Sequence, residues 1–474
     1  MLFPTVEYAL FFLAVLSIAW SVYRFPKVHK GFLLLASYAF YGFWNWTFLP
    51  LLIGISVFAG VVAKFIQHSN SRGARNAWLA VGVTVCLVVL GYFKYSTFLL
   101  ANWFAFRGWF APSPPRIPII SPLLPLGISF FVFHAISLLV DCHRGKVTEP
   151  VQLGDALLYV AFFPQLIAGP ILRASCFLPQ LAVRRNPDAI RVNRAFLLIL
   201  SGLFKKVVIS NMLATRLVEP VFSVPRSFGA ADTLLAIYGY AAQIYCDFSG
   251  YTDIAVGCAL LLGFHLPRNF NAPYKATNPQ EFWRRWHISL SRWLRDYLYF
   301  PLGGSRKGPL RTGFNLMLTM LLGGLWHGAA WTFVAWGGLH GLLLVVYRLW
   351  SRSTWHELIA IHNSTAWRWI ARILLFHAVC AGWVLFRAPS FEVAFDVFRR
   401  LAVPGATTLA TTPVCIVLFL GLAGQYMPSR WGNALEVELG RWPALARGAA
   451  LAVVIALIEI LGPTGVAAFI YFQF

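Results

Sequence analysis

Long apolar stretches recur along almost the whole chain, and few charged residues separate them. About 20 consecutive apolar residues are enough to cross a bilayer as a helix. Only 12% of the residues are charged, whereas a soluble domain carries about 25%. So few charges cannot cover the surface of a soluble protein of this size, so we expect lipid to be the solvent for most of the chain. The apolar stretches are Tyr8–Tyr23, Gly31–Trp46, Leu49–Ile66, Trp78–Leu100, Leu123–Val140, Ala156–Ile171, Ala195–Leu213, Thr233–Phe264, Asn315–Trp336, Leu339–Leu349, Trp369–Phe386, Val414–Tyr426 and Ala449–Ile460.

These stretches predict an all-α polytopic membrane protein. Several are too short or too interrupted to span alone, so we expect about ten to twelve membrane-embedded helices, together with interfacial and re-entrant helices. The sequence has no internal repeat and no long polar segment, which predicts one membrane domain over residues 1–474. Its seven cysteines are scattered without a C-x-x-C pair, so we expect neither a metal site nor a disulfide framework.

The net charge of +22 indicates contact with anionic lipid rather than with nucleic acid, because basic residues flank the apolar stretches. Basic loops near residues 27, 72 and 145 alternate with loops of low charge. This alternation predicts that these three loops are cytoplasmic and that the N-terminus is periplasmic. The arginines between residues 173 and 194 break the alternation, so either one segment is re-entrant or the number of spans differs by one.

Residues 267–311 differ from their surroundings, with nine basic and two acidic residues and many aromatic ones. At about 100° per residue, one face collects Trp283, Trp286, Leu290, Trp293, Leu294 and Tyr297. This periodicity predicts a single amphipathic helix at the cytoplasmic interface. The helix either anchors the protein to anionic lipid or forms a basic mouth for a polyanionic donor such as coenzyme A. In the second case the donor-binding candidates are Arg284, Arg285, Arg292, Arg295, Trp286 and Asn269.

The most unusual polar residue is His327, within Trp326-His327-Gly328. Residues 312–350 are predicted to form the helices around it. A helix that enters the membrane at Thr312 would place His327 about 22 Å deep, where an imidazole is costly unless it faces a polar cavity. Gly324 and Gly328 would let a substrate or another backbone approach. A neutral imidazole suits the removal of a proton from an acceptor hydroxyl, and the alternative is a histidine that bonds neighbouring helices.

Two carboxylates, Asp247 and Asp253, lie in an otherwise apolar stretch. Intramembrane carboxylates are candidates for function, here as part of a substrate funnel that also includes Trp326, Gly324 and Gly328. The alternative is a structural role in which they pair with Arg284 or Arg285. His340, in Gly338-Leu-His-Gly341, either faces the same funnel or packs between helices.

At these residues the chain resembles the membrane-bound O-acyltransferase family, in its bacterial exopolysaccharide branch. The resemblance rests on several motifs spread over nearly the whole chain. They are Pro125-Leu-Gly-Ile-Ser-Phe-Phe131, Phe163-Pro-Gln-Leu-Ile-Ala-Gly-Pro170, Gln243-Ile-Tyr-Cys-Asp-Phe-Ser-Gly-Tyr-Thr-Asp253, Phe282-Trp-Arg-Arg-Trp-His-Ile-Ser-Leu-Ser-Arg-Trp-Leu-Arg-Asp-Tyr-Leu-Tyr299, Pro301-Leu-Gly-Gly304, Gly324-Leu-Trp-His-Gly-Ala-Ala-Trp331 and Phe469-Ile-Tyr-Phe-Gln-Phe474.

The resemblance implies a shell of helices around a thin central funnel, with His327 as the essential histidine and His287 as the second. It also implies acetyl-CoA as the cytoplasmic donor, an inner-membrane location and acetyl transfer to a periplasmic exopolysaccharide. Implied partners are a periplasmic SGNH-type acetyltransferase, other exopolysaccharide-acetylation proteins and a polysaccharide synthase complex. The opening Met1-Leu-Phe-Pro-Thr resembles the cellulose-acetylation member somewhat more than the alginate member, both of which serve biofilm polysaccharides.

Two alternatives stay open at this point. One is a D-alanyl or lipid O-acyltransferase of the same fold, and the other is a transporter or scaffold of a polysaccharide-export complex that makes no covalent bond. Transporters commonly carry paired repeats with broken helices, and the sequence has no such repeat.

Overall fold

The computed structural model describes residues 3–108, 122–353, 364–463 and 470. Within these residues every regular element is a helix, as expected for a chain that must satisfy its backbone polar groups inside lipid. The final motif, 469–474, lies outside the described residues except for Ile470. The chain forms two compact units, which are described separately: residues 1–190 with 261–266 and 328–330, and residues 191–260 with 267–327 and 331–474.

Six helical segments in the described part of the chain are long and apolar enough to cross a bilayer, or seven if the bent pair Thr412–Tyr426 and Arg430–Arg441 is one span. Two shorter apolar helices, Val6–Ser21 and Ile128–His143, come in addition. The prediction of an all-α polytopic membrane protein is therefore confirmed. The six are Pro26–His68, Arg72–Gly108, Val192–Ser223, Trp331–Trp350, Thr365–Arg387 and Ala444–Leu461.

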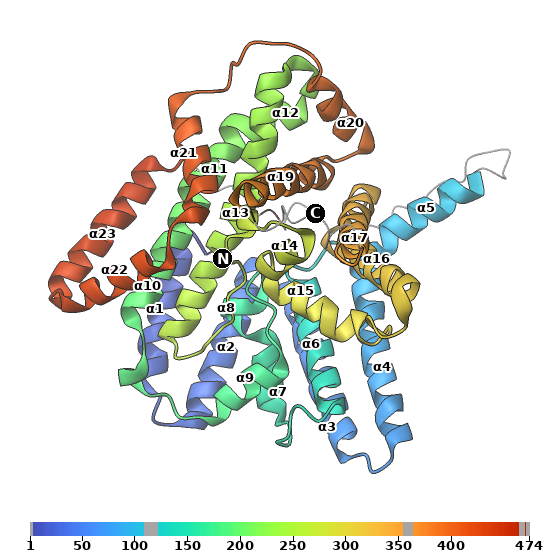
Figure 1. Cartoon of the computed structure of the whole chain (residues 1–474). Coiled ribbons are helices and arrows are strands. Elements are labelled where there is room, and N and C mark those ends of the chain that lie inside the picture. The colour runs from blue at the N-terminus through green and yellow to red at the C-terminus, as the bar shows by residue number, and fades with distance from the viewer. Residues whose placement is uncertain (1–2, 109–121, 354–363, 464–469, 471–474) are drawn as a thin grey trace. The chain divides into compact units, whose positions relative to one another are not determined.

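The first unit is a helical bundle in which α3 contacts α4, α6 and α7 (Figure 1). Its core includes an aromatic cluster, in which the Phe40 ring lies 5.9 Å from that of Tyr8 and 5.7 Å from that of Phe163. The helices are α1 (Val6–Ser21), α2 (Pro26–Asn45), α3 (Leu49–His68), α4 (Arg72–Leu90), α5 (Ser96–Gly108), α6 (Ile128–His143), α7 (Leu153–Ala161), α8 (Phe163–Leu166) and α9 (Ala174–Ala182).

The predicted span 156–171 is wrong, because the chain breaks at Phe162 into the short helices α7 and α8. The break frees the carbonyl of Tyr159, which accepts a hydrogen bond of 2.7 Å from the Gln165 side chain, as buried backbone groups require. The Tyr159 hydroxyl then donates to the carbonyl of Leu172 at 2.7 Å. The chain therefore does not form one continuous span here, while the reason why the arginines between residues 173 and 194 break the charge alternation stays open between a re-entrant segment and a different number of spans.

Hydrogen bonds and an ion pair connect the segments that contain the basic loops at one end of this unit. Arg75 donates to the carbonyl of His143 at 2.7 Å, and Gln67 donates to the carbonyl of Val147 at 3.2 Å. Lys30, near the start of α2, pairs with Asp155 at 2.8 Å. The basic segments near residues 27, 72 and 145 therefore lie at the same end, as the alternation requires, while the side of the membrane they face stays a prediction.

The second unit is built around the long helix α13. Glycines bring α10 and α13 together, because a Cβ on Gly202 would lie 2.5 Å from the carbonyl oxygen of Gly250. The α-helices are α10 (Val192–Leu203), α11 (Asn211–Leu213), α12 (Glu219–Ser223), α13 (Ala230–Leu261), α14 (Pro279–Arg285), α15 (Ile288–Leu294), α16 (Gly308–His327), α17 (Trp331–Trp350), α19 (Thr365–Arg387), α20 (Phe391–Arg400), α21 (Thr412–Ala423), α22 (Ser429–Arg441) and α23 (Ala444–Leu461). Between α10 and α12 the chain forms the π-helical segments Phe204–Ser210 and Ala214–Val218.

Candidate active site

The hairpin of α16 and α17 determines where His327 lies. The apolar stretch 315–336 was expected to be one helix, but α16 ends at His327 and α17 begins at Trp331. The two helices run side by side (Figure 1), because a Cβ on Gly324 would lie only 2.3 Å from the carbonyl oxygen of Phe333. The missing side chain of Gly324 therefore makes room for the backbone of α17 rather than for a substrate. The close packing of the two helices places Trp326 and His327 at the turn between them.

The His327 side chain is 3% exposed and lies among aromatic rings. Its ring centroid lies 4.9 Å from that of Trp326, 5.0 Å from that of Trp336 and 5.2 Å from that of Phe386, all in edge-to-face geometry. Trp336 comes from α17 and Phe386 from α19, so three helices fix the imidazole.

His287 lies at a break that the sequence pattern did not predict. The expected single amphipathic helix is instead two short helices, α14 and α15, and His287 between them has a left-handed φ of 39°. Asn278 caps α14 by accepting a hydrogen bond from the Glu281 N–H at 2.9 Å. After the break, the N–H of Ile288 donates to the carbonyl of Asn269 at 2.8 Å. Tertiary contacts with the segment before α14 therefore override the local helical periodicity.

The side chain of Asn269 fixes the tautomer of His287. The Asn269 Oδ1 atom accepts hydrogen bonds from the Ser289 N–H at 3.1 Å and from the Ser289 hydroxyl at 2.9 Å. A backbone N–H can only donate, so the amide oxygen must face Ser289 and the neighbouring Nδ1 of His287, 3.2 Å away, must carry a proton. The Nε2 atom of His287 is then the deprotonated nitrogen, and it has no hydrogen-bond partner among the described residues.

Burial keeps this imidazole neutral. His287 is fully buried, and burial lowers its pKa to about 3. Asn269, predicted to bind the donor, is itself 2% exposed and contacts His287 and Ser289. Asn269 therefore holds the His287 ring in place, while its binding of the donor stays a prediction.

Aromatic rings connect three buried histidines into one cluster. Trp326 contacts both His287, at 6.0 Å between ring centroids, and His327, at 4.9 Å. Trp336 in turn contacts both His327 and His340, the latter at 4.9 Å. We call this the histidine–aromatic cluster, and its rings are Phe248, Phe270, Phe282, Trp283, Trp326, Trp336, Trp383 and Phe386. His340, which the motif Gly338-Leu-His-Gly341 singled out, thus packs beside Trp336 within the same cluster as His327.

The basic residues of the predicted mouth point away from the buried face of α14 and α15. Arg284, Arg292 and Arg295 are exposed, whereas Trp286 is 1% exposed and belongs to the core. Arg285 pairs with Glu281 at 2.8 Å. Arg295 pairs with Asp296 at 2.8 Å, and this hydrogen bond raises the pKa of the guanidinium. The segment thus keeps an exposed positive surface on one side and a buried apolar face on the other.

Of the two alternatives for Asp247 and Asp253, the pairing with Arg284 or Arg285 is wrong. Asp247 pairs with Lys206, and Asp253 pairs with Lys205. Asp247 also accepts hydrogen bonds from the Ser210 hydroxyl at 3.3 Å and from the Ile470 N–H at 2.9 Å. The two lysines precede the carboxylates by more than 40 residues, so only the packing of α10 and its π-helical continuation against α13 brings them together.

The described residues contain no group of three or more His, Cys, Asp or Glu side chains that could hold a metal ion. The cluster places buried imidazoles among aromatic rings, in an apolar environment. A proton acceptor of this kind is suited to activating a hydroxyl group.

The sequence profile of the membrane-bound O-acyltransferase family matches residues 126–386, which include both His287 and His327. The chain is 40% identical to a protein of Azotobacter vinelandii named "Probable alginate O-acetylase", over 82% of this chain and 76% of that protein. It is 39% identical to a peptidoglycan O-acetyltransferase of Helicobacter pylori, over 79% of this chain and 74% of that protein. It is 31% identical to a teichoic acid D-alanyltransferase of Bacillus subtilis, over 56% of this chain and 69% of that protein.

The chain therefore belongs to the membrane-bound O-acyltransferase family. This membership confirms the predictions of a membrane-bound acyltransferase enzyme and of a multi-pass membrane protein. The roles of the individual site residues, the donor and the acceptor are proposals, which follow.

Proposed function

We propose that the protein moves acetyl groups from cytoplasmic acetyl-CoA across the inner membrane for the O-acetylation of a periplasmic exopolysaccharide. The observation that carries this proposal is the histidine–aromatic cluster, in which Trp326 separates two buried imidazoles, His287 and His327. The acetyl group is favoured over D-alanine because the two O-acetylating relatives are 40% and 39% identical to the chain and the D-alanyltransferase 31%.

In the proposed reaction His327 acts as the base. An acceptor hydroxyl oxygen attacks the thioester carbonyl carbon, and the hydroxyl proton passes to the imidazole. The tetrahedral intermediate then collapses, the carbon–sulfur bond breaks, and the imidazolium returns its proton to the sulfur. The products are an acetate ester and coenzyme A thiol, so no metal or oxidant is needed. A positioned general base contributes about 10²- to 10⁴-fold to such a rate.

The second histidine and the basic surface take supporting roles in this proposal. His287, held as a neutral imidazole by Asn269, offers Nε2 as a further hydrogen-bond acceptor beside Trp326. The exposed Arg284, Arg292 and Arg295 attract the phosphates of the donor. Their side chains keep the charge at the surface, so that only the acetyl thioester has to enter the apolar region.

The acceptor in this proposal is a periplasmic polysaccharide, reached through an SGNH-type partner whose serine receives the acetyl group first. Cellulose is our first candidate from the N-terminal sequence, and alginate is the second. When a strain that lacks the gene is complemented with the wild-type protein, its polysaccharide should regain ester-linked acetate. The chemical identity of the sugar that carries this acetate identifies the acceptor.

The decisive test measures acetyl transfer by the His327→Ala variant. Cells that produce the variant should contain normal amounts of the membrane protein and lack O-acetylated polysaccharide. The matched control is His377→Ala, since His377 lies on α19 and is exposed. Purified wild-type protein in nanodiscs, supplied with acetyl-CoA and an acceptor, should release coenzyme A thiol. Full acetylation by His327→Ala contradicts the assignment, and polysaccharide export without any thiol release favours a transporter or scaffold.

A further inference from the structure

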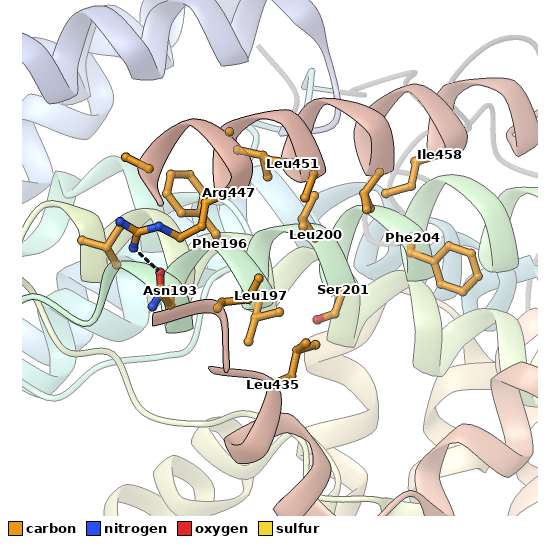
Figure 2. Close-up of a pocket in the computed structure, with 16 residues that line it drawn as sticks. Asn193, Phe196, Leu197, Leu200, Ser201, Phe204, Leu435, Arg447, Leu451 and Ile458 are labelled. Carbon is orange, nitrogen blue, oxygen red and sulfur yellow. Dashed lines mark hydrogen bonds between the residues drawn. The ribbon is translucent and has the colours of Figure 1, made fainter. Parts of the chain in front are cut away.

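An apolar groove runs between α10, α22 and α23, at a distance in sequence from the histidine motifs. Its cavity volume is about 650 Å³. Figure 2 shows Phe196, Leu200 and Leu451 along its length, with Ile458 towards one end. Of the residues of α23, Ile458 is the one that is buried. The groove therefore opens on a helix that is apolar enough to lie in the bilayer.

The opposite end of the groove carries a positive charge. Arg447, in the first turn of α23, donates a hydrogen bond of 3.1 Å to the Asn193 side chain (Figure 2). No carboxylate in the described part of the chain lies within 4 Å of the Arg447 guanidinium. The nearby acid Glu436 is already paired with Arg191 at 2.8 Å. Among the described residues, Arg447 at the mouth of the apolar groove is therefore bonded to a neutral amide and has no carboxylate partner.

The length of the groove matches one half of a bilayer. From Arg447 to Ile458 the helix rises by 11 residues, or about 16 Å at 1.5 Å per residue. The hydrocarbon core of a bilayer is about 30 Å thick, so one leaflet contributes about 15 Å. A groove of this length with a cation at one end has the dimensions of a lipid in a single leaflet.

A transmembrane helix of a partner fits the groove less well. A helix would have to bring a carboxylate to Arg447, whereas a phospholipid phosphate supplies the negative charge and its bonding oxygens together.

We propose that this groove binds an anionic phospholipid, with an acyl chain along Phe196, Leu200 and Leu451 and the phosphate bound by Arg447 and Asn193. The inference concerns a site separate from acetyl transfer and stands whether or not the proposed function is correct. Arginine is suited to this role because its planar guanidinium binds two phosphate oxygens at once.

Native mass spectrometry of the purified full-length protein tests the site with two lipids of the same acyl chains, phosphatidylglycerol and phosphatidylcholine. We expect phosphatidylglycerol to remain bound at collision energies that remove phosphatidylcholine, with at least a tenfold difference in occupancy. Arg447→Gln should abolish this preference, and Arg399→Gln, at an exposed arginine on α20, should leave it unchanged. Equal retention of both lipids by the wild-type protein overturns the proposal.

A second variant fills the groove without touching its charge. Gly448 lines the groove and has open space where a Cβ would lie, so Gly448→Leu should exclude the acyl chain and reduce the binding of both lipids. Gly54→Leu, at another glycine with open space on the apolar helix α3, is the matched control and should bind lipid normally. Unchanged lipid occupancy in Gly448→Leu rejects the site. So does a photocrosslink to a protein instead of a lipid, formed by a benzophenone reagent attached to the cysteine of Ser201→Cys.

Discussion

The second unit contains two groups of buried polar side chains that differ in how they avoid the cost of burial. In the histidine–aromatic cluster, His287 and His340 are buried among aromatic rings, and His287 is held by a neutral amide. Between α10 and α13, by contrast, Lys206 and Asp247 form an ion pair with side chains 2% and 3% exposed. One region buries neutral bases, and the other buries opposite charges that compensate each other.

This difference indicates which group is able to react. A carboxylate beside an imidazole stabilises the charged imidazolium, whereas an amide leaves the ring neutral and ready to accept a proton. The ion pair has no such freedom, because losing either charge leaves the other unpaired in an apolar environment. The histidine–aromatic cluster is thus suited to chemistry, and the pairs of α13 are suited to holding helices together.

The largest expected effect is on acetyl transfer, and it distinguishes the histidine–aromatic cluster from the ion pairs of α13. His327→Gln should lower acetyl transfer by about 10²- to 10⁴-fold, the usual contribution of a general base, while the melting temperature stays close to that of the wild type. Asp253→Asn, at the half-buried pair with Lys205, should retain most of the activity. Acetate ester released from purified polysaccharide measures both. A severe loss of activity in Asp253→Asn, with normal stability, would mean that this carboxylate takes part in the reaction. The ion pairs would then not differ from the histidine–aromatic cluster in function.

The next effect concerns stability. Asp247→Leu alone should destabilise the protein by about 3–5 kcal/mol, the usual cost of leaving a buried charge unpaired. The double variant Asp247→Leu with Lys206→Met should recover much of this loss, since neither charge is then buried. Thermal unfolding in detergent, followed by circular dichroism, gives both values. If the double variant is as unstable as the single one, the ion pair is not what stabilises the contact between these helices.

A smaller effect tests the support of His287 by Asn269. Asn269→Asp places a carboxylate beside Nδ1 and should raise the pKa of His287, so the acid limb of the pH–activity profile moves to higher pH. Asn269→Ala should slow acetyl transfer about tenfold, since one hydrogen bond is lost. Ser289→Ala removes a different donor to the same oxygen and should leave the pH profile in place. A profile that Asn269→Asp does not move would show that His287 has no part in the step observed.

The smallest effect is the dependence of stability on pH. The pKa of His287 falls from 6.5 to about 3 on folding, so the unfolded state binds more protons between these values. Stability is therefore complete above about pH 7 and falls as the pH drops below 6.5, by about 1.4 kcal/mol per pH unit. His287→Gln should lose less stability between pH 6.5 and 5.5 than the wild type does. Equal losses in the two proteins would mean that His287 is not buried in the neutral state.

The sequence by itself determined the helical membrane class and the family. It also identified His327 and His287 as candidate site residues. Apolar length and charge scarcity are local properties, and Trp326-His327-Gly328 is a contiguous motif, so they can be read without knowledge of any distant contact. Four of the six residues of the predicted apolar face, Trp286, Leu290, Trp293 and Leu294, are buried in the structure, although the single helix at the membrane interface that the pattern predicted is divided into α14 and α15.

Only the tertiary structure decided how these parts are joined. The helical period continues through His287, yet the N–H of Ile288 and the side chain of Ser289 bond to Asn269, 20 or fewer residues earlier, and the helix breaks. Asp247 met Lys206 rather than an arginine because α10 packs closely on α13 at Gly202 and Gly250. Local periodicity does not predict such pairings, because each depends on which backbones approach closely enough for two distant side chains to come into contact.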